Sequence, residues 1–212
     1  MLVVAHKVVS KAEGRVRRLD EVDPGERASE LAARHGKDAR LVQAVLDESA
    51  ELLRAVDGTL ICVTRRGFVC ANAGVDQSNA SAGELVLLPE DPDASAAALR
   101  AGIGAARGVR PAVVVADSFG RAWRLGQTDV ALGAAGLTPL DQWIGRRDAF
   151  GRELRVTSIA VADSVAAAAD LARAKDSLEP VVLVRGLERF VTDDDGPGAA
   201  ALRRPPEQDL FR

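Results

Sequence analysis

The stretch from Pro111 to Ala116 limits the possible folds of this chain most strongly, because its residues are apolar without alternation. A strand with one face in water would alternate, so this run predicts a strand covered on both sides, as in an α/β sheet. Polar residues begin at Asp117 and Ser118. Ligands of open α/β sheets gather at the carboxyl ends of buried strands. Asp117 therefore stands where a ligand is expected, although an aspartate at a strand end is more often a cap or turn former.

Composition narrows the class of protein. A chain of 212 residues suffices for one large domain or two small ones, with a core that needs no disulfide or metal. Aromatic residues make up only 3% and the net charge is −3, so we expect no nucleic-acid partner. No apolar run approaches membrane-spanning length and no signal peptide is visible, so we expect a cytoplasmic protein without a membrane partner.

Hydrophobic periodicity and turn residues predict alternating strands and helices. Because the first strand begins at the second residue, we expect a native N-terminal segment to be missing. Residues 1–190 are expected to form one domain, and the Asp/Gly/Pro-rich residues 191–212 a C-terminal tail or linker. Strands are predicted at Leu2–Val9, Arg15–Val22, Thr59–Thr64, Phe68–Ala71, Glu84–Leu88, Pro111–Ala116, Leu154–Val161 and Pro180–Val184, and helices at Glu26–His35, Asp38–Leu53, Asp91–Arg107 and Asp163–Ala174.

Cys62 and Cys70 flank the turn of a predicted hairpin, at Arg65–Gly67. They could therefore lie near each other on neighbouring strands. Without a secretory signal, we expect both to be reduced, buried thiols.

Three polar clusters each follow an apolar strand, and together they suggest a site for a metal ion and phosphate. Two aspartates at strand ends and a hydroxyl are hard oxygen ligands, which suit Mg²⁺ or Mn²⁺. Lys11 and Asn79 could then hold phosphate oxygens, although a solvated Lys11 is the simpler reading. No Walker A run or Gly-x-Gly-x-x-Gly is present, so nucleotide binding would use neither cradle. The clusters are Lys7 with Lys11, Asp76 with Asn79, and Asp117 and Ser118 with Gln127 and Asp129.

Several sequence blocks, spread over nearly the whole chain, occur in an order typical of one enzyme family. They are Lys7–Arg15, Gly74–Asn79, Leu88–Ala96, Asp117–Arg121, Arg124–Asp129 and Val181–Gly186. In this order they resemble the coenzyme F420:L-glutamate ligases. The ending Asp209–Phe211 also resembles the end of the ligase half of the two-domain actinobacterial enzyme, in which a flavin-binding, nitroreductase-like domain follows.

The resemblance implies a GTP-dependent ligase. A terminal carboxylate of the deazaflavin coenzyme F420 precursor would be phosphorylated by GTP, and the amine of L-glutamate would attack the acyl phosphate, releasing GDP and phosphate. The implied fold is a mixed α/β architecture whose sheet intertwines with that of a second subunit, so a homodimer is expected.

The resemblance also implies roles for single residues. Asp76 and Asp117 would hold one Mg²⁺ or Mn²⁺ ion and Ser118 a second metal, with K⁺ as a further candidate ion. GTP would contact Lys11 and Asn79, with His6 and Lys7 beside them. Candidates for contacting the substrate or supporting the metal ligands are Arg121, Gln127 and Asp129.

The chain departs from the family pattern at two residues. His6 stands where the family usually has a serine that touches the nucleotide. By the resemblance, Lys175 falls near the second metal, where many members have Gln or Glu. A lysine cannot ligate a metal, and Asp176 is the candidate substitute. Two other readings stay open: a metal-dependent phosphohydrolase, and an inactive, truncated domain that binds the coenzyme or dimerises.

Overall fold

The computed structural model describes residues 1–210 of this chain, which fold into two compact units. Unit 1 combines Met1–Ala5, Pro92–Ser118 and the chain from Thr128 onward. Unit 2 combines His6–Asp91 with Phe119–Gln127. The chain contains both helices and strands, and the main sheet contains both parallel and antiparallel pairs, so the predicted mixed α/β class is confirmed.

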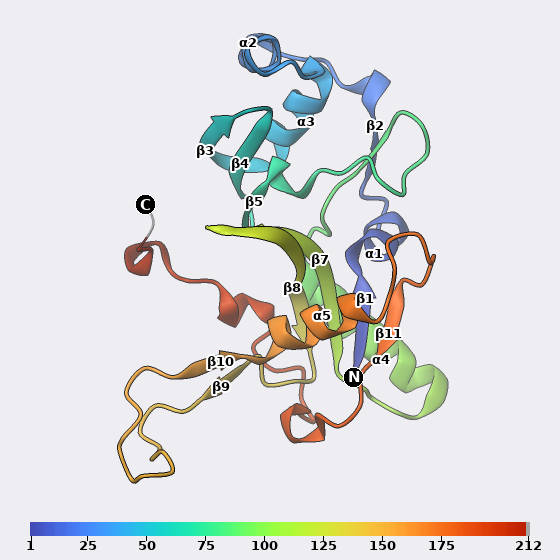
Figure 1. Ribbon diagram of the computed structural model, residues 1–212. Helices are drawn as coiled ribbons and strands as arrows, with labels where there is room; N and C mark the ends of the chain where they lie inside the picture. Colours follow the sequence, from blue (N-terminus) through green and yellow to red (C-terminus); the bar gives the residue numbers. More distant parts are fainter. Residues whose placement is uncertain (211–212) are drawn as a thin grey trace. The chain divides into compact units, whose positions relative to one another are not determined.

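The main sheet of unit 1 has four strands in the order β11-β1-β7-β8 (Figure 1). Strand β1 runs parallel to β7, with Val3 opposite Val114, and antiparallel to β11, with Val3 opposite Val182. The side chains of Val3 and Val114 are fully buried, as the apolar run predicts for a central strand. These strands are β1 (Leu2–Ala5), β7 (Val113–Arg121), β8 (Arg124–Ala135) and β11 (Val181–Leu183).

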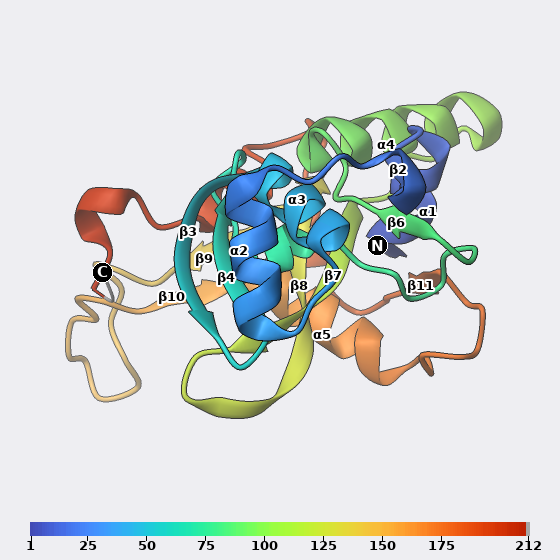
Figure 2. The same cartoon turned by 90° about the horizontal axis from the view of Figure 1, so that it is seen from above.

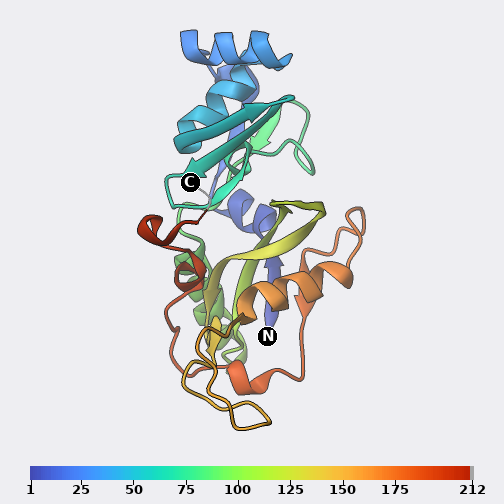
Figure 3. The same ribbon diagram turned by 60° about the vertical axis from the view of Figure 1, so that its left-hand side comes forward.

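Two helices lie on opposite faces of this sheet, α4 (Pro92–Arg107) and α5 (Val161–Leu171) (Figures 1 and 3). The buried positions of α5 include Val161, Val165 and Ala169, which lie one helical turn apart and face the sheet as one stripe. Strands β9 (Leu140–Gln142) and β10 (Ser158–Ala160) form a separate antiparallel pair.

Residues beyond Phe190 bind to unit 1 through backbone and ionic contacts. Val191 forms a bridge with Leu137, and Ala199 donates its backbone N–H to Asp93 at 2.6 Å. The expected boundary between residues 190 and 191 stays a prediction. Of the ending Asp209–Phe211, Phe211 lies outside the described residues.

Unit 2 is built on a three-stranded antiparallel sheet, with helices α2 and α3 above it (Figures 2 and 3). Its core joins Ala28 and Leu31 of α2, Val45 of α3 and Leu60 of the sheet. A two-stranded sheet and helix α1 complete the unit. Its elements are α1 (His6–Ala12), β2 (Val16–Arg18), α2 (Glu26–His35), α3 (Ala39–Glu48), β3 (Ser49–Val56), β4 (Thr59–Thr64), β5 (Val69–Ala71) and β6 (Glu84–Val86).

The two cysteines lie directly opposite each other, Cys62 on β4 and Cys70 on β5. Both are buried free thiols, which confirms the prediction. Burial raises the pKa of Cys62, so its thiol stays protonated at neutral pH.

The predicted strand Leu2–Val9 is wrong in its second half, because the chain turns into helix α1 at His6. In this helix His6, Val9 and Ser10 are buried, a spacing of three and four residues that fits one helix face. The β-branched pair Val8–Val9 favours a strand locally, but tertiary packing overrides that preference. Lys7 is therefore a helix residue, and the helix ends at Ala12.

The helix predicted from Asp38 to Leu53 ends at Glu48, and Ser49 begins strand β3. Asp38 caps the helix as predicted, accepting the backbone N–H of Arg40 at 2.8 Å. The register of β3 shifts twice against β4, so its apolar residues do not alternate strictly.

Other predicted bounds change as well. Strand β7 continues through Asp117 to Arg121, so Asp117 lies inside the strand and not at its end. Helix α5 begins at Val161, and Asp163 does not cap it but accepts the backbone N–H of Ala131 at 2.9 Å. The strands predicted at Arg15–Val22, Glu84–Leu88, Leu154–Val161 and Pro180–Val184 are shorter in the structure, as β2, β6, β10 and β11.

Across residues 1–210, no helix combines the length and apolarity needed to cross a membrane.

Candidate functional site

The residues that the sequence singles out belong to both units and form two clusters, one around Asp76 and one around Ser118. Unit 1 contains Asp117, Ser118 and Asp129. Unit 2 contains His6, Lys7, Lys11, Asp76, Asn79, Arg121 and Gln127.

Helix α1 presents two lysines to one loop of unit 2. Lys7 and Lys11 are four residues apart and share a helix face. The Nζ of Lys7 is 2.5 Å from Oδ2 of Asp76 and also donates to Oγ of Ser78 at 2.5 Å. The Nζ of Lys11 donates to the backbone carbonyl of Asn79 at 2.6 Å. Two of the three predicted clusters therefore meet in the structure.

The loop that carries Asp76 is fixed at both of its ends. The backbones of Asp76 and Val86 exchange two hydrogen bonds beside strand β6. The Asp76 carboxylate then accepts the N–H and the hydroxyl of Ser78, both at 2.8 Å, a turn typical of aspartate. Asn79 has a φ of 54°, a left-handed conformation that asparagine adopts more readily than most residues. The backbone carbonyl of Asn79 thereby contacts Lys11.

The Asp76 side chain is ionised at neutral pH. Burial raises its pKa, but hydrogen bonds from Lys7 and Ser78 outweigh burial and hold the pKa below the usual value. The side chain is 42% exposed, so solvent reaches the carboxylate. A half-exposed carboxylate of this kind binds cations, and here it holds the ammonium group of Lys7.

His6 begins the same helix but points into the protein, with only 1% of its surface exposed. Its Nδ1 lies 3.2 Å from Oγ of Ser10. That His6 contacts GTP stays a prediction.

In unit 1, Ser118 joins a network of charged side chains. Its Oγ donates to Oδ1 of Asp129 at 2.6 Å and accepts a hydrogen bond from Lys175. Asp129 is 1% exposed, and Arg173 neutralises it from 2.5 Å, which a buried carboxylate requires. The predicted pair Ser118 and Asp129 is therefore brought together, with an ammonium group beside the hydroxyl.

Other predicted residues lie apart from these networks. Asp117 and Ser118 are neighbours in strand β7, so their side chains point to opposite faces of the sheet. Arg121 donates to the backbone carbonyl of Leu125 at 2.6 Å across the β7–β8 turn. Gln127 lies on the exposed part of β8 in unit 2, whereas Asp129 is buried in unit 1.

Two residues of these clusters were missed from the sequence. Ser78 follows Asp76 at the spacing of an Asx turn, and this signal could have identified it. Arg173 lies in the segment after helix α5, far from Asp129 in sequence, and no local pattern indicates their ion pair.

A divalent cation suits the donor chemistry of both clusters, because each offers carboxylate or hydroxyl oxygens that already hold an ammonium group. Among residues 1–210, no group of three or more His, Cys, Asp or Glu side chains could by itself hold a metal ion. Mg²⁺ is commonly bound by one or two carboxylates together with water and substrate phosphates, so a small set of protein ligands fits this ion. The family resemblance would give Asp76 and Asp117 to one ion and Ser118 to a second, and this assignment stays a prediction.

Comparison with known proteins identifies the family. The family model for F420-0:Gamma-glutamyl ligase matches residues 1–186. The Coenzyme F420:L-glutamate ligase of Archaeoglobus fulgidus is 49% identical, and the proteins of the same name from Methanothermobacter thermautotrophicus and Methanopyrus kandleri are each 44% identical. These matches span 100% of this chain and 84–85% of the relatives. The chain therefore belongs to the F420-0:gamma-glutamyl ligase family.

Proposed function

We propose that this chain ligates L-glutamate to the terminal carboxylate of a coenzyme F420 precursor, using GTP. The names of its relatives support the joining of glutamate to this coenzyme. GTP as the energy source, the acyl-phosphate intermediate and the release of GDP and phosphate follow from the sequence resemblance and are part of the proposal. A cytoplasmic homodimer is proposed on the same basis.

The observation that carries this proposal is the meeting of Lys7 and Lys11 with the loop from Asp76 to Asn79. Two ammonium groups and an ionised carboxylate lie on one loop–helix junction of unit 2. Transfer of a phosphoryl group spreads negative charge over its oxygens, and fixed cations stabilise that charge. An ammonium group acts here as a point charge, which tolerates the changing geometry of the transferred group.

The lysines have different tasks in this scheme. Lys7 is bound to Asp76 and Ser78, so it orients the carboxylate. Lys11 has one hydrogen bond to the Asn79 carbonyl and an exposed side chain, so its remaining donors can reach a phosphate oxygen. A divalent cation, when bound, would neutralise phosphate charge beside the carboxylates. Asp76 would supply an anionic oxygen ligand, because its lowered pKa keeps it ionised.

One assay tests the proposal against its alternatives. The protein is incubated with GTP, Mg²⁺ or Mn²⁺, L-glutamate and the glutamate-free coenzyme, and the masses of the products are measured by mass spectrometry. We expect the coenzyme to gain one glutamyl unit, with GDP and phosphate formed in equal amounts. Phosphate release that does not require glutamate would instead identify a phosphohydrolase. Coenzyme binding without any turnover would reduce the chain to a binding domain.

A further inference from the structure

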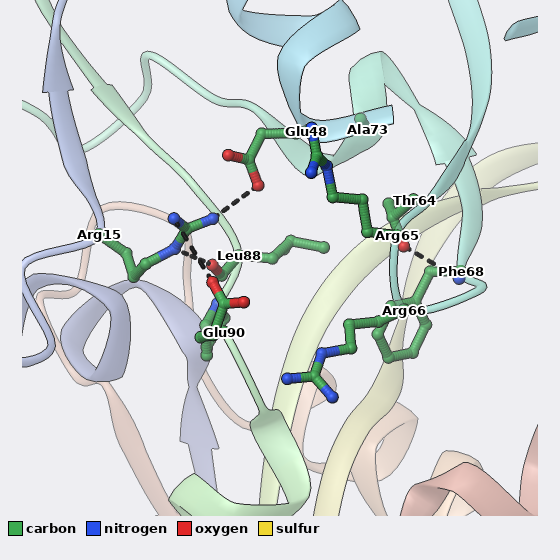
Figure 4. A pocket seen from close by; sticks show the side chains of 10 residues that line it. Arg15, Glu48, Thr64, Arg65, Arg66, Phe68, Ala73, Leu88 and Glu90 are labelled. Atoms are coloured by element: carbon green, nitrogen blue, oxygen red, sulfur yellow. Dashed lines mark hydrogen bonds and ion pairs between the residues drawn. The ribbon is translucent and has the colours of Figure 1, made fainter. Parts of the chain in front are cut away.

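Unit 2 contains a small pocket that neither cluster explains (Figure 4). Its volume is about 50 Å³. This is a few times the volume of about 10–15 Å³ that a cavity needs to hold one water molecule, so there is room for a small group only. A nucleobase or a deazaflavin ring is too large, so the pocket fits the head of a small side chain. Its lining residues are Arg15, Glu48, Thr64, Arg65, Arg66, Phe68, Ala73, Leu88, Pro89 and Glu90.

One side of the pocket is a fixed guanidinium group, that of Arg15. Its Nε donates to the Leu88 carbonyl at 3.0 Å, and its NH2 donates to Glu48 at 2.6 Å. The third nitrogen, NH1, has only a loose pair with Glu90, at 3.7 Å. The Glu90 side chain is 74% exposed, so this pair contributes little and Glu90 can move into solvent.

The opposite side is the β4–β5 turn, which carries Arg65 and Arg66. This turn is rigid, because Thr64 accepts the backbone N–H of Phe68 through its hydroxyl and Gly67 has a φ of 81°. Arg66 pairs with Asp91 at 3.3 Å, and both side chains are 46% exposed. In Figure 4 its guanidinium group extends to the left of the Phe68 ring, toward the side of the pocket on which Glu90 lies.

The remaining wall is apolar. Phe68, Leu88 and Pro89 line it, and Phe68 is held edge-on by Phe119 with ring centroids 6.4 Å apart. A cavity that combines guanidinium groups with an apolar wall suits an anion on a short hydrocarbon stem. The charges that face it are those of Arg15, Arg65 and Arg66 against Glu48 and Glu90. With Asp91, which pairs with Arg66 at 3.3 Å, three guanidinium groups meet three carboxylates, so a ligand carboxylate that displaces the exposed Glu90 side chain keeps the charges balanced.

We propose that this pocket binds the carboxylate of a glutamyl group, in place of the Glu90 carboxylate. This inference rests on the proposed function, since a ligase for L-glutamate acts on glutamyl compounds. The carboxylate can come from two sources: free L-glutamate, or a glutamyl unit already attached to the coenzyme. The guanidinium groups of Arg15 and Arg66, which both line the pocket, face the bound carboxylate, and the side-chain methylenes lie against Phe68.

Binding measurements on four variants test this proposal. L-glutamate, the glutamate-free coenzyme and the coenzyme with one glutamyl unit are each titrated calorimetrically, at fixed salt, with Mg²⁺ and a non-hydrolysable GTP analogue. Arg66→Gln should weaken the glutamyl ligand about tenfold, the loss expected for a charge-assisted hydrogen bond in a partly exposed site. Arg66→Lys should restore part of this affinity, since a lysine retains charge but not the paired donors. Glu90→Gln should tighten binding, because it removes the competing carboxylate.

The matched control is Arg34→Gln, which removes the same charge from an exposed position on helix α2. It should change none of the affinities. An effect of Arg66→Gln on L-glutamate alone identifies the free amino acid as the source, and an effect on the glutamyl-bearing coenzyme alone identifies the tail. Equal affinities of Arg66→Gln and Arg34→Gln for all three ligands overturn the proposal, as does wild-type protein that binds no glutamyl compound.

These outcomes separate the pocket from the reaction. Wild-type turnover with unchanged binding by Arg66→Gln refutes the pocket and leaves the ligase function intact. A wild-type protein without turnover whose glutamyl affinity still depends on Arg66 refutes the ligase function and supports the pocket. Thermal unfolding of each variant confirms that the fold is retained, as expected for a substitution in an exposed turn.

Discussion

At the scale of single residues, the side chains of Lys7 and Lys11 project from the same face of helix α1 and contact different groups. Lys7 contacts a carboxylate and a hydroxyl, whereas Lys11 contacts a backbone carbonyl. A carbonyl cannot neutralise an ammonium group, so Lys11 keeps its full charge next to the loop. This difference makes Lys11 the better candidate for phosphate.

Lys11→Ala should lower the affinity for a GTP analogue by about 10- to 100-fold, the loss of a charge-assisted hydrogen bond to phosphate. Stability should change by less than about 0.5 kcal/mol, because the side chain is exposed. Calorimetric titration at one salt and metal concentration measures both proteins. Lys37→Ala, which removes a lysine outside the Asp76 cluster, serves as the control. If the two variants bind the analogue as wild type does, Lys11 does not contact the nucleotide.

The sequence predicts much of the Asp76 cluster and less of its detail. Polar residues after an apolar segment mark Asp76 and Asn79, and the four-residue spacing of Lys7 and Lys11 is visible in the sequence, even though a strand was expected there. The sequence does not show that Asn79 contacts Lys11 through its backbone carbonyl, since every residue has such a carbonyl. Nor does it show Arg173 beside Asp129, because that ion pair joins segments 44 residues apart.

At the scale of elements, the start of helix α3 was predicted correctly from the sequence and its end was not. The start of α3 at Asp38 was predicted because the capping residue lies next to the helix it caps. The end of α3 was not, because β3 is distorted by its partner strand β4, which follows later in the chain. Local signals therefore predict helix starts here better than strand bounds.

Asp38→Ala should lower the free energy of unfolding by about 1 kcal/mol at pH 7, the usual cost of a lost N-cap. Asp38→Asn should retain most of that stability, because asparagine also caps helices. Hydrogen bonds from the Arg40 side chain and backbone lower the pKa of Asp38 to about 2 from 3.8. Since the folded pKa is depressed, the stabilisation by the charge is present above about pH 4 and is lost as pH falls toward 2.

Urea unfolding of wild type and Asp38→Asn between pH 7 and pH 2 measures this effect. The difference between the two proteins should shrink over that lower range. A difference that does not depend on pH would show that Arg40 does not interact with the ionised carboxylate.

Gly133→Ala should destabilise unit 1 severely, by about 3 kcal/mol or more. A Cβ at Gly133 would lie 2.0 Å from the backbone oxygen of Pro92, which cannot rotate away as a side chain can. Gly102→Ala, in helix α4, meets no atom within 4 Å and should stabilise by about 0.5–1 kcal/mol. Denaturant unfolding of both variants gives the comparison. Similar stabilities would show that β8 and α4 do not pack this closely.

At the scale of the whole molecule, the chain passes between its two units four times. Asp76 belongs to unit 2 and Asp117 to unit 1. The family resemblance assigns both to one metal ion, and this assignment stays a prediction. No short-range signal in a sequence can establish that two carboxylates so far apart in the chain bind the same metal ion.

Asp76→Asn and Asp117→Asn should each weaken Mn²⁺ binding by about 10- to 100-fold, because a hard cation loses an anionic ligand. If both bind one ion, the double variant should lose little more than either single variant. Titration of Mn²⁺ followed by electron paramagnetic resonance measures the affinities without catalysis. Losses that simply add would assign the two carboxylates to separate roles.

The central position of β1 has a consequence for the order of folding during synthesis. This strand is made before its partners, and those around Val114 and Val182 are made much later. At about 5–20 residues per second, the ribosome needs roughly ten to forty seconds to reach the second partner. Most of unit 2, which follows β1 directly, can fold in that interval. The four apolar residues Leu2–Ala5 then wait unpaired outside the ribosome, and a chaperone that shields them would act before their partner strands are made.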